Sequence, residues 1–328
     1  MKKSFNRKLV YCAFTASIVT LSSANVTAQL SDYNLNLDAN IEIDTDAIKV
    51  KDNSTEYSQG GRVEVNFTAE RKFNEYYVRA KGTGLLQKSG ETATDDMWLM
   101  FGNHLWALQA GRFETTNLFP LGKDTLVYHA GAGEAQVYEA NFARGRVSDG
   151  GQFAFHLTPS DNLSFELGTQ FGGGDKTTAI SGVRPAVTFG NDAARVSVGL
   201  ERLKYTAESG DSIHKEGYGI ALSGNYAGGG YNLALAQMKD KEDSSINKVT
   251  SVTANMTYGA FGAGVIHSLT DRSVGNDPKV TTAYAAYTLP LFDIQNASVT
   301  FAGSVSTASN VSSANDASGL RMRFNYTF

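Results

Sequence analysis

Histidine is the side chain best suited to acid–base or metal chemistry near neutral pH, and the chain has five histidines. They stand singly, at His104, His129, His156, His214 and His267. A hydrolytic relay needs a serine or aspartate held beside a histidine, and a zinc site needs ligands at fixed spacings. No histidine begins a metal-spacing motif, and no Gly-x-Ser-x-Gly sequence occurs. The sequence therefore argues against an enzyme or a metal site, and no cofactor is expected.

A second kind of chemistry is the stacking of flat, partly polar rings against the faces of sugars. Rings of this kind fall within one segment, residues 113–150, at Phe119, Tyr128, His129 and Tyr138. With Asn, Asp and Arg nearby to bond hydroxyl groups, the rings would suit a saccharide. The alternative is that they only pack their segment onto Trp98 and Trp106. The residues leave both interpretations open.

The elements that must position these side chains are strands, and the C-terminal one is the clearest. Leu320, Met322, Phe324, Tyr326 and Phe328 alternate with Arg321, Arg323, Asn325 and Thr327, so one face is apolar and the other polar. This segment resembles the closing strand of bacterial outer-membrane barrels, whose terminal Phe is read by the barrel assembly machinery. The resemblance implies that Phe324, Tyr326 and Phe328 act as an assembly signal.

The N-terminus has the pattern of a secretory signal peptide. Lys2, Lys3, Arg7 and Lys8 precede an apolar stretch at 9–21, and Val26-Thr27-Ala28 suits cleavage before Gln29. Removing residues 1–28 takes away the single cysteine and leaves 25 Lys and Arg residues against 33 Asp and Glu residues, a net charge of −8. Such an acidic chain is a poor candidate for binding nucleic acid. No later apolar run reaches the roughly 20 residues of a membrane helix.

Amphipathic segments recur to the end of the chain, and thirty-three glycines against five prolines agree with an all-β protein. We expect one domain at 29–328, an antiparallel barrel that spans the outer membrane, because short turns alternate with longer polar loops and the interior positions are polar. A barrel this wide encloses water. The expected sixteen strands are 33–44, 63–70, 76–86, 96–101, 104–112, 152–158, 163–171, 182–189, 195–203, 216–226, 231–238, 250–258, 261–268, 281–289, 297–305 and 320–328.

The segment 113–150 interrupts this pattern, and a connection this long is usually functional. The strands before it are apolar on both faces, at 97–101 and 105–108. An inward apolar face must be covered by protein in a wet channel. We therefore expect 113–150 to fold into the lumen against these strands, or another subunit to cover their outer face, or both.

The stretch from Trp98 to Glu114, with Gly102-Asn103-His104 at a turn and Ala110-Gly111-Arg112-Phe113 at its exit, resembles the segment before loop three of the general bacterial porins. The resemblance extends through 152–172 and to the last strand. It implies a homotrimer of 16-stranded, water-filled channels in the Gram-negative outer membrane, surrounded by lipid and narrowed by loop three. Such channels pass small hydrophilic solutes and ions, saccharides among them in some members.

The resemblance also implies a constriction with basic residues on the wall and acidic residues on the loop. Arg112 occupies the position of the family's wall arginine, and the basic cluster would comprise Arg62, Arg79, Lys81, Arg112, Arg144 and Arg146. The acids of the loop are Glu114, Asp124, Glu134 and Glu139. The usual Pro-Glu-Phe-Gly tip is replaced by Phe119-Pro120-Leu121-Gly122. Opposite signs across a narrow throat would create a transverse field that orients polar solutes; alternatively, these charges are only solvated lumen residues.

Alternatives to a 16-stranded porin remain open, in strand number and in function. A monomeric 14-stranded channel specific for oligosaccharides would result if 182–189 and its partner were not strands. A barrel enzyme or a structural, adhesive barrel would show no stable conductance.

Overall fold

The computed structural model describes residues 33–122, 126–148, 150–174 and 177–328. The expected signal peptide at 1–28 lies outside them. Within these ranges no helix is long and apolar enough to cross a membrane. The regular elements in the described ranges are sixteen strands: β1 (Tyr33–Val50), β2 (Glu56–Phe73), β3 (Tyr76–Gln87), β4 (Thr92–Gly102), β5 (Trp106–Arg112), β6 (Gly151–Ser160), β7 (Leu163–Gly174), β8 (Thr177–Gly190), β9 (Arg195–Ala207), β10 (Ser212–Tyr226), β11 (Gly229–Asp240), β12 (Ile246–Tyr258), β13 (Phe261–Arg272), β14 (Lys279–Pro290), β15 (Ala297–Ser309) and β16 (Asp316–Thr327).

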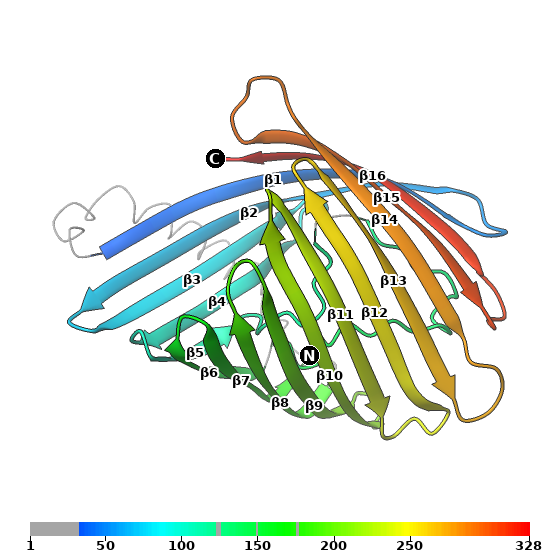
Figure 1. Ribbon diagram of the computed structural model, residues 1–328, viewed down its shortest axis with the longest axis horizontal. Helices are drawn as coiled ribbons and strands as arrows, with labels where there is room; N and C mark the ends of the chain where they lie inside the picture. The colour runs from blue at the N-terminus through cyan, green and yellow to red at the C-terminus, as the bar shows by residue number, and fades with distance from the viewer. Residues whose placement is uncertain (1–32, 123–125, 149, 175–176) are drawn as a thin grey trace, which may run out of the picture.

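The strands form one closed antiparallel barrel (Figure 1). Each strand pairs with its neighbours in sequence, and β1 pairs with β16 from Asn40↔Thr327 to Val50↔Ala317. Closure removes every sheet edge, so all ladder hydrogen bonds can be satisfied within the sheet. The expectation of sixteen strands is confirmed. The 14-strand alternative is wrong, because 182–189 and 195–203 belong to β8 and β9, which pair at Val187↔Val198.

Side chains alternate between the two faces of the barrel wall as the period-two pattern requires. Leu35, Val65, Phe155, Phe165 and Phe324 are exposed on the outer face. Glu64, Glu166 and Arg323 take the opposite phase and form polar contacts inside. The barrel therefore has an apolar outside and a polar inside, as expected for a wall between lipid and water.

The strands extend beyond the ranges expected from their apolar pattern. β10 begins at Ser212 rather than 216, β12 begins at Ile246 rather than 250, and β1 continues to Val50. These extensions carry polar residues on both faces, so hydrophobic alternation did not reveal them. Backbone pairing continues there because the ladder hydrogen bonds do not depend on an apolar face.

The buried side chains are concentrated on the inner faces of β8 to β15. Ala221, Ala236, Val249 and Ile266 are almost fully buried there, although a wide barrel wall by itself would leave them facing water. What covers them is the connection between β5 and β6.

Candidate functional site: the lumen and its inner loop

We call residues 113–150 the inner loop. Its described residues, 113–122, 126–148 and 150, lie against the inside of the barrel wall. In Figure 1 the teal trace after β5 crosses behind the green and yellow strands. Backbone amides of the inner loop donate hydrogen bonds to buried wall hydroxyls at 2.8–3.2 Å: Tyr128 to Ser304, Ala130 to Ser306, Gln136 to Thr270 and Tyr138 to Ser251. Bonds through the main chain fix the path of the loop along β12 to β15.

An apolar seam lies between the inner loop and the wall. Leu118, Phe119 and Tyr138 are each at most 2% exposed. They pack with inward wall residues, three of which are alanines, namely Ala221, Ala234, Ala236, Met238, Val249, Ile266 and Tyr284. The alanines leave space for the loop, and burial of the seam removes its apolar side chains from water.

Glycines on the inner face mark where the inner loop approaches the wall most closely. A Cβ at Gly217 would overlap the hydroxyl of Tyr138, and one at Gly219 would lie 2.7 Å from the Cβ of Leu118. Neither glycine has the positive φ that would explain its presence by backbone conformation. Space for the loop is the physical reason for glycine at these positions.

The buried pair Arg184 and Glu201 fastens both ends of the inner loop. Nε of Arg184 lies 3.3 Å from the carboxylate of Glu201, and the two side chains are 0% and 1% exposed. Arg184 donates to Thr115 Oγ1 at 3.2 Å and to the carbonyl of Ala140 at 3.0 Å. The arginine on β8 thereby joins the start of the loop to its returning part.

Glu201 on β9 completes this anchor. Its carboxylate accepts the hydroxyl of Tyr138 and the amides of Phe142 and Ala143, both at 3.0 Å. Burial raises the pKa of the Tyr138 hydroxyl far above its ordinary value, and the charge of Glu201 adds to this effect. Tyr138 therefore acts as a hydrogen-bond donor to Glu201 at every physiological pH.

A second anchor ties the end of the inner loop to β4. Arg146 contacts Asp95 at 2.5 Å and Asp96 at 3.1 Å, and Asp96 also accepts Nζ of Lys81 at 2.8 Å. The register of β3 and β4 shifts opposite these aspartates, with Gly82↔Met97 followed by Gly84↔Thr94. A bulge of this kind re-aims side chains, and it lets two adjacent carboxylates contact one guanidinium.

Arg112 departs from its expected position on the basic wall. It pairs with Met97, whose side chain is exposed on the outer face, so Arg112 belongs to the outward phase of β5. Its guanidinium donates to the carbonyls of Thr94, Asp95 and Arg146 and to the hydroxyl of Ser148. The residue secures the base of the inner loop. The positive φ of Gly111 shows that the strand is irregular at this point, which the alternation of residues could not reveal.

The inward side chains of β16, β1 and β2 form a surface of alternating charge, which we call the paired wall. Arg321 lies 2.8 Å from Asp46, Arg323 lies 2.6 Å from Asp44, and Arg62 lies 3.1 Å from Glu42 and 3.4 Å from Glu64. The neighbouring Arg79 of β3 donates to Glu70 at 2.8 Å. Of the expected basic cluster, Arg62, Arg79 and Lys81 thus contact acids of the wall.

The acids of the inner loop also have partners of their own, none of them on the paired wall. Glu114 contacts Arg144 at 2.8 Å within the loop, and Glu134 contacts Ser312 and, at 3.6 Å, Arg272. Glu139 is half-buried; burial raises the pKa of its carboxyl group, and Arg144 opposes the shift. Asp124 lies outside the described residues. The structure therefore does not bring these loop acids onto the arginines of the paired wall.

Two of the four rings proposed for sugar stacking are covered. Phe119 and Tyr138 lie in the seam, where Tyr138 packs against Phe142 with ring centroids 4.8 Å apart. Tyr128 and His129 are half-buried, and Nδ1 of His129 lies 2.7 Å from Thr282 Oγ1. The buried rings pack the loop onto β10 to β14, and the expectation that they pack onto Trp98 and Trp106 is wrong. The inner loop contacts β4 and β5 through polar groups, at Arg146 and Arg112, while its apolar seam lies on β10 to β14.

Sequence reasoning missed Arg184, Glu201, Asp44 and Asp46. A signal was available for the first pair, because Arg184 lies between the outward Val183 and Pro185, and Glu201 follows the outward Leu200 on the next strand. Placing them opposite each other required the register Val183↔Arg202. That register depends on the conformation of the turn between β8 and β9, which the sequence pattern does not define.

Comparisons with known proteins agree with this architecture. A family model described as "Porin-like glycoporin RafY" matches residues 26–328. No curated protein sequence matches the chain significantly. The fold is similar to the anion-selective porin of Comamonas acidovorans, with a TM-score of 0.68 at 12% identity, covering 90% of this chain and 100% of that one.

Two further solved structures share the fold. In-vitro folded OmpT of Vibrio cholerae, in its trimer form, has a TM-score of 0.67 at 12% identity and covers 91% of this chain and 100% of its own. OmpF of Salmonella typhi, in complex with daunomycin, has a TM-score of 0.65 at 12% identity and covers 90% of this chain and 98% of its own.

Proposed function

Because the chain belongs to the porin family described as glycoporin RafY, we propose that its outer-membrane channel favours neutral, polyhydroxylated solutes such as saccharides over ions of either sign. The observation that carries this proposal is the pairing of charges on both sides of the passage. The paired wall lies on one side and the inner loop, seated on β8 to β15, lies on the other.

Local pairing changes what the charges can do. A basic wall opposite an acidic loop would impose a field across the throat. When Arg62, Arg321 and Arg323 instead contact carboxylates on adjacent strands, the fields of the partners largely cancel beyond a few ångströms. What remains is a dense array of hydrogen-bond donors and acceptors. Hydroxyl groups both donate and accept, so a sugar can exchange its bound water for contacts with the paired wall.

The proposal is tested by swelling of liposomes that contain the purified porin. Glucose, glucosamine and gluconate are similar in size and carry zero, positive and negative charge. We expect glucose to enter at least as fast as either ion. Entry of one charged sugar several-fold faster than glucose would contradict the proposal.

A series of maltodextrins then separates a sieve from a specific site. Saturable block of the ionic current by one oligosaccharide would indicate a binding site, whereas an abrupt size limit without block would indicate sieving. Stable open steps in the same recordings also separate the proposed passive channel from an enzyme or an adhesive barrel.

A trimer is the assembly that best explains the outer face of β2 to β5. Tyr76 lies between Phe101, at 5.8 Å, and Trp106, at 6.5 Å between ring centroids. Met97 and Leu99 beside them are more than half exposed. A large exposed apolar patch marks a protein or lipid contact, and rings at this density suit a partner subunit. Chemical crosslinking of the purified porin should give a three-subunit band, and Leu99→Lys should weaken it.

A further inference from the structure

Three side chains of β3 and β4 form an apolar strip on the inner face of the barrel, namely Tyr77, Trp98 and Met100. Trp98 pairs with Lys81 and Met100 pairs with Arg79, so both lie on the inward phase with those bases. The hydroxyl of Tyr77 lies 3.5 Å from Sδ of Met100. The three side chains are therefore neighbours on the wall of the passage.

The apolar strip lies between the second anchor of the inner loop and the short turn that joins β4 to β5. Asp96, which binds Arg146, comes two residues before Trp98. At the other end, Tyr77 pairs with Gly102. The four residues of strand from Trp98 to Gly102 span about 13 Å. A solute that has passed the anchor toward the short turns meets the strip before it leaves the barrel.

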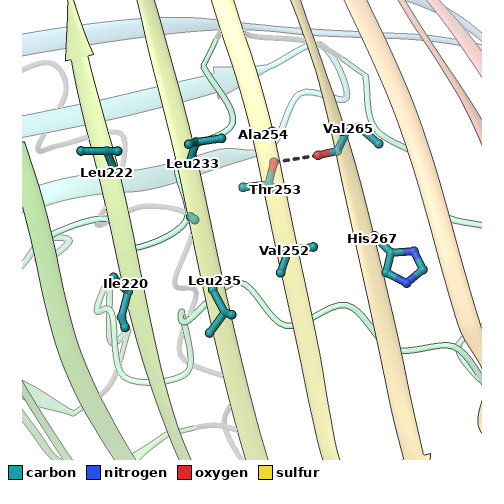
Figure 2. Close-up of a pocket in the computed structure, with 10 residues that line it drawn as sticks. Ile220, Leu222, Leu233, Leu235, Val252, Thr253, Ala254, Val265 and His267 are labelled. Carbon is teal, nitrogen blue, oxygen red and sulfur yellow. Dashed lines mark hydrogen bonds between the residues drawn. The ribbon is translucent and has the colours of Figure 1, made fainter. Parts of the chain in front are cut away.

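Apolar side chains on the inner face need a different partner from those on the outer face. Over β10 to β13 the outer face has an apolar hollow, lined by Leu233 and Val252 among others (Figure 2), and membrane lipid covers such a surface. The apolar strip faces the aqueous side of the wall. Among the described residues, neither buried cluster of the inner loop includes it, and its side chains are only half-buried. An accessible apolar patch in a passage points to a ligand with an apolar face.

Two hydrogen-bond donors beside the apolar strip have no acceptor. Gln109 pairs with Met100 and is 6% exposed, and its Oε1 lies 3.1 Å from Nε2 of His156. Within the described ranges nothing accepts a hydrogen bond from Nε2 of Gln109 or from Nε1 of Trp98. Neither atom is buried, because the one buried polar side-chain atom without a partner in those ranges is Nε of Arg144. Both donors are available to a ligand in the passage.

We propose that the apolar strip is a binding site for a saccharide, with the C–H face of a sugar ring on the indole of Trp98 and its hydroxyl groups at Gln109 and Arg79. This inference rests on the proposed function and gives the passage a specific site. A sugar ring has an apolar face and a rim of hydroxyl groups, which matches an apolar surface bordered by donors. Met100 and Tyr77 extend the surface toward the short turn, where a second linked ring would lie. Arg79 stays beside the strip because its guanidinium lies 5.2 Å from the centroid of the Tyr77 ring.

The charges around the apolar strip favour a neutral ligand. Each base on the inner face there has a carboxylate partner. The pairs are Lys72–Glu70 at 3.5 Å, Arg79–Glu70 at 2.8 Å, Lys81–Asp96 at 2.8 Å and Arg146–Asp95 at 2.5 Å. A charged aromatic solute would have to compete with these partners, whereas a sugar hydroxyl can bond to the free donors without displacing them.

Fluorescence can report on the site directly, because the chain has two tryptophans and only Trp98 is inside the barrel. Trp106 stacks against Phe101 on the outer face. In purified Trp106→Phe porin we expect maltotriose to change the emission of Trp98 saturably and to protect it from quenching by acrylamide. Trp98→Phe, which keeps Trp106, is the matched control and should give no response.

Two results of this titration would overturn the proposal. One is that maltotriose changes neither the emission nor the quenching of Trp106→Phe porin. The other is a saturable response to benzyl alcohol with none to maltotriose, which would show that the strip takes aromatic solutes. Heat-dependent gel mobility confirms that each variant is a folded barrel.

Block of the ionic current tests the apolar strip during passage. Trp98→Ala should weaken the block by maltotriose about five- to ten-fold. Leu99→Ala, at the adjacent outward position, is the matched control and should leave it unchanged. Equal block of wild-type and Trp98→Ala porin would show that the strip is not the site, even if glucose enters liposomes as proposed. Faster entry of a charged sugar would instead contradict the proposed function, while the fluorescence titration still decides whether the strip binds saccharide.

Discussion

Arg184 and Glu201 form an ion pair inside the barrel wall, 3.3 Å apart and with essentially no exposed surface. Between them they contact the inner loop at Thr115, Ala140, Phe142 and Ala143. Removing one charge from a buried pair leaves the other uncompensated, at a cost of about 3 to 5 kcal/mol. The pair is therefore a sensitive point in the attachment of the inner loop.

We expect Glu201→Gln to release the inner loop without opening the barrel, because the ladder hydrogen bonds of β8 and β9 remain. Single-channel recordings should show a larger and noisier conductance, and the free energy of unfolding should fall by about 3 to 5 kcal/mol. Glu216→Gln is the matched control, since Glu216 is 39% exposed in its ion pairs and such pairs contribute about 0 to 1 kcal/mol.

The double variant R184M/E201L separates charge burial from loop attachment. It removes both buried charges, so it should recover part of the lost stability while the conductance stays raised. A Glu201→Gln porin with wild-type conductance and wild-type noise would show that the pair does not hold the constriction.

Gly217→Val tests the seam from the wall side. Its side chain would occupy the position of the Tyr138 hydroxyl, which displaces the ring and breaks the contact with Glu201. We expect an increase in conductance and in the size limit for sugars. Gly84→Val is the control, because nothing lies within 4 Å of a Cβ there. An unchanged size limit would mean that the loop keeps its place without Tyr138.

The sequence predicted the barrel better than it predicted the contacts of the inner loop, and the reason is the range of the interactions. A strand such as 163–171 is revealed by its own alternating residues, and antiparallel closure follows from adjacency. The contact between Tyr138 and Glu201 joins residues 63 positions apart. It depends on barrel curvature and strand register, which no local pattern records. Arg112 shows the opposite error. Its motif predicted a position on the lumen wall, but the strand is irregular at Gly111, and the guanidinium of Arg112 binds backbone carbonyl groups instead.

Ion selectivity distinguishes the paired wall from the polarised arrangement, in which basic residues on the wall face acidic residues on the loop. Arg62→Gln leaves Glu42 and Glu64 without this partner, so the reversal potential under a salt gradient should shift toward cation preference. Glu42→Gln should shift it toward anions. The shifts should be largest at low ionic strength, where screening is weakest.

Arg112→Gln is the informative comparison for these variants. It should leave the reversal potential nearly unchanged, because the guanidinium contacts carbonyl groups at the loop base. A strong cation shift in Arg112→Gln with no shift in Arg62→Gln would restore the polarised arrangement.

The terminal aromatic can be tested separately from barrel closure. The main chain of Phe328 exchanges two hydrogen bonds with Ala39, at 2.8 and 2.9 Å, and its ring stacks on Tyr326 at 5.6 Å. Phe328→Ala keeps both backbone bonds, whereas deletion of Phe328 removes them. We expect Phe328→Ala to fold normally into detergent from the purified chain and to lose several-fold of its outer-membrane yield in cells. Deletion should reduce both quantities. Phe189→Ala, an exposed ring on β8, controls for the loss of an outward aromatic. Normal outer-membrane yield of Phe328→Ala would show that the ring is not the assembly signal, and that the last residue matters only for joining β16 to β1.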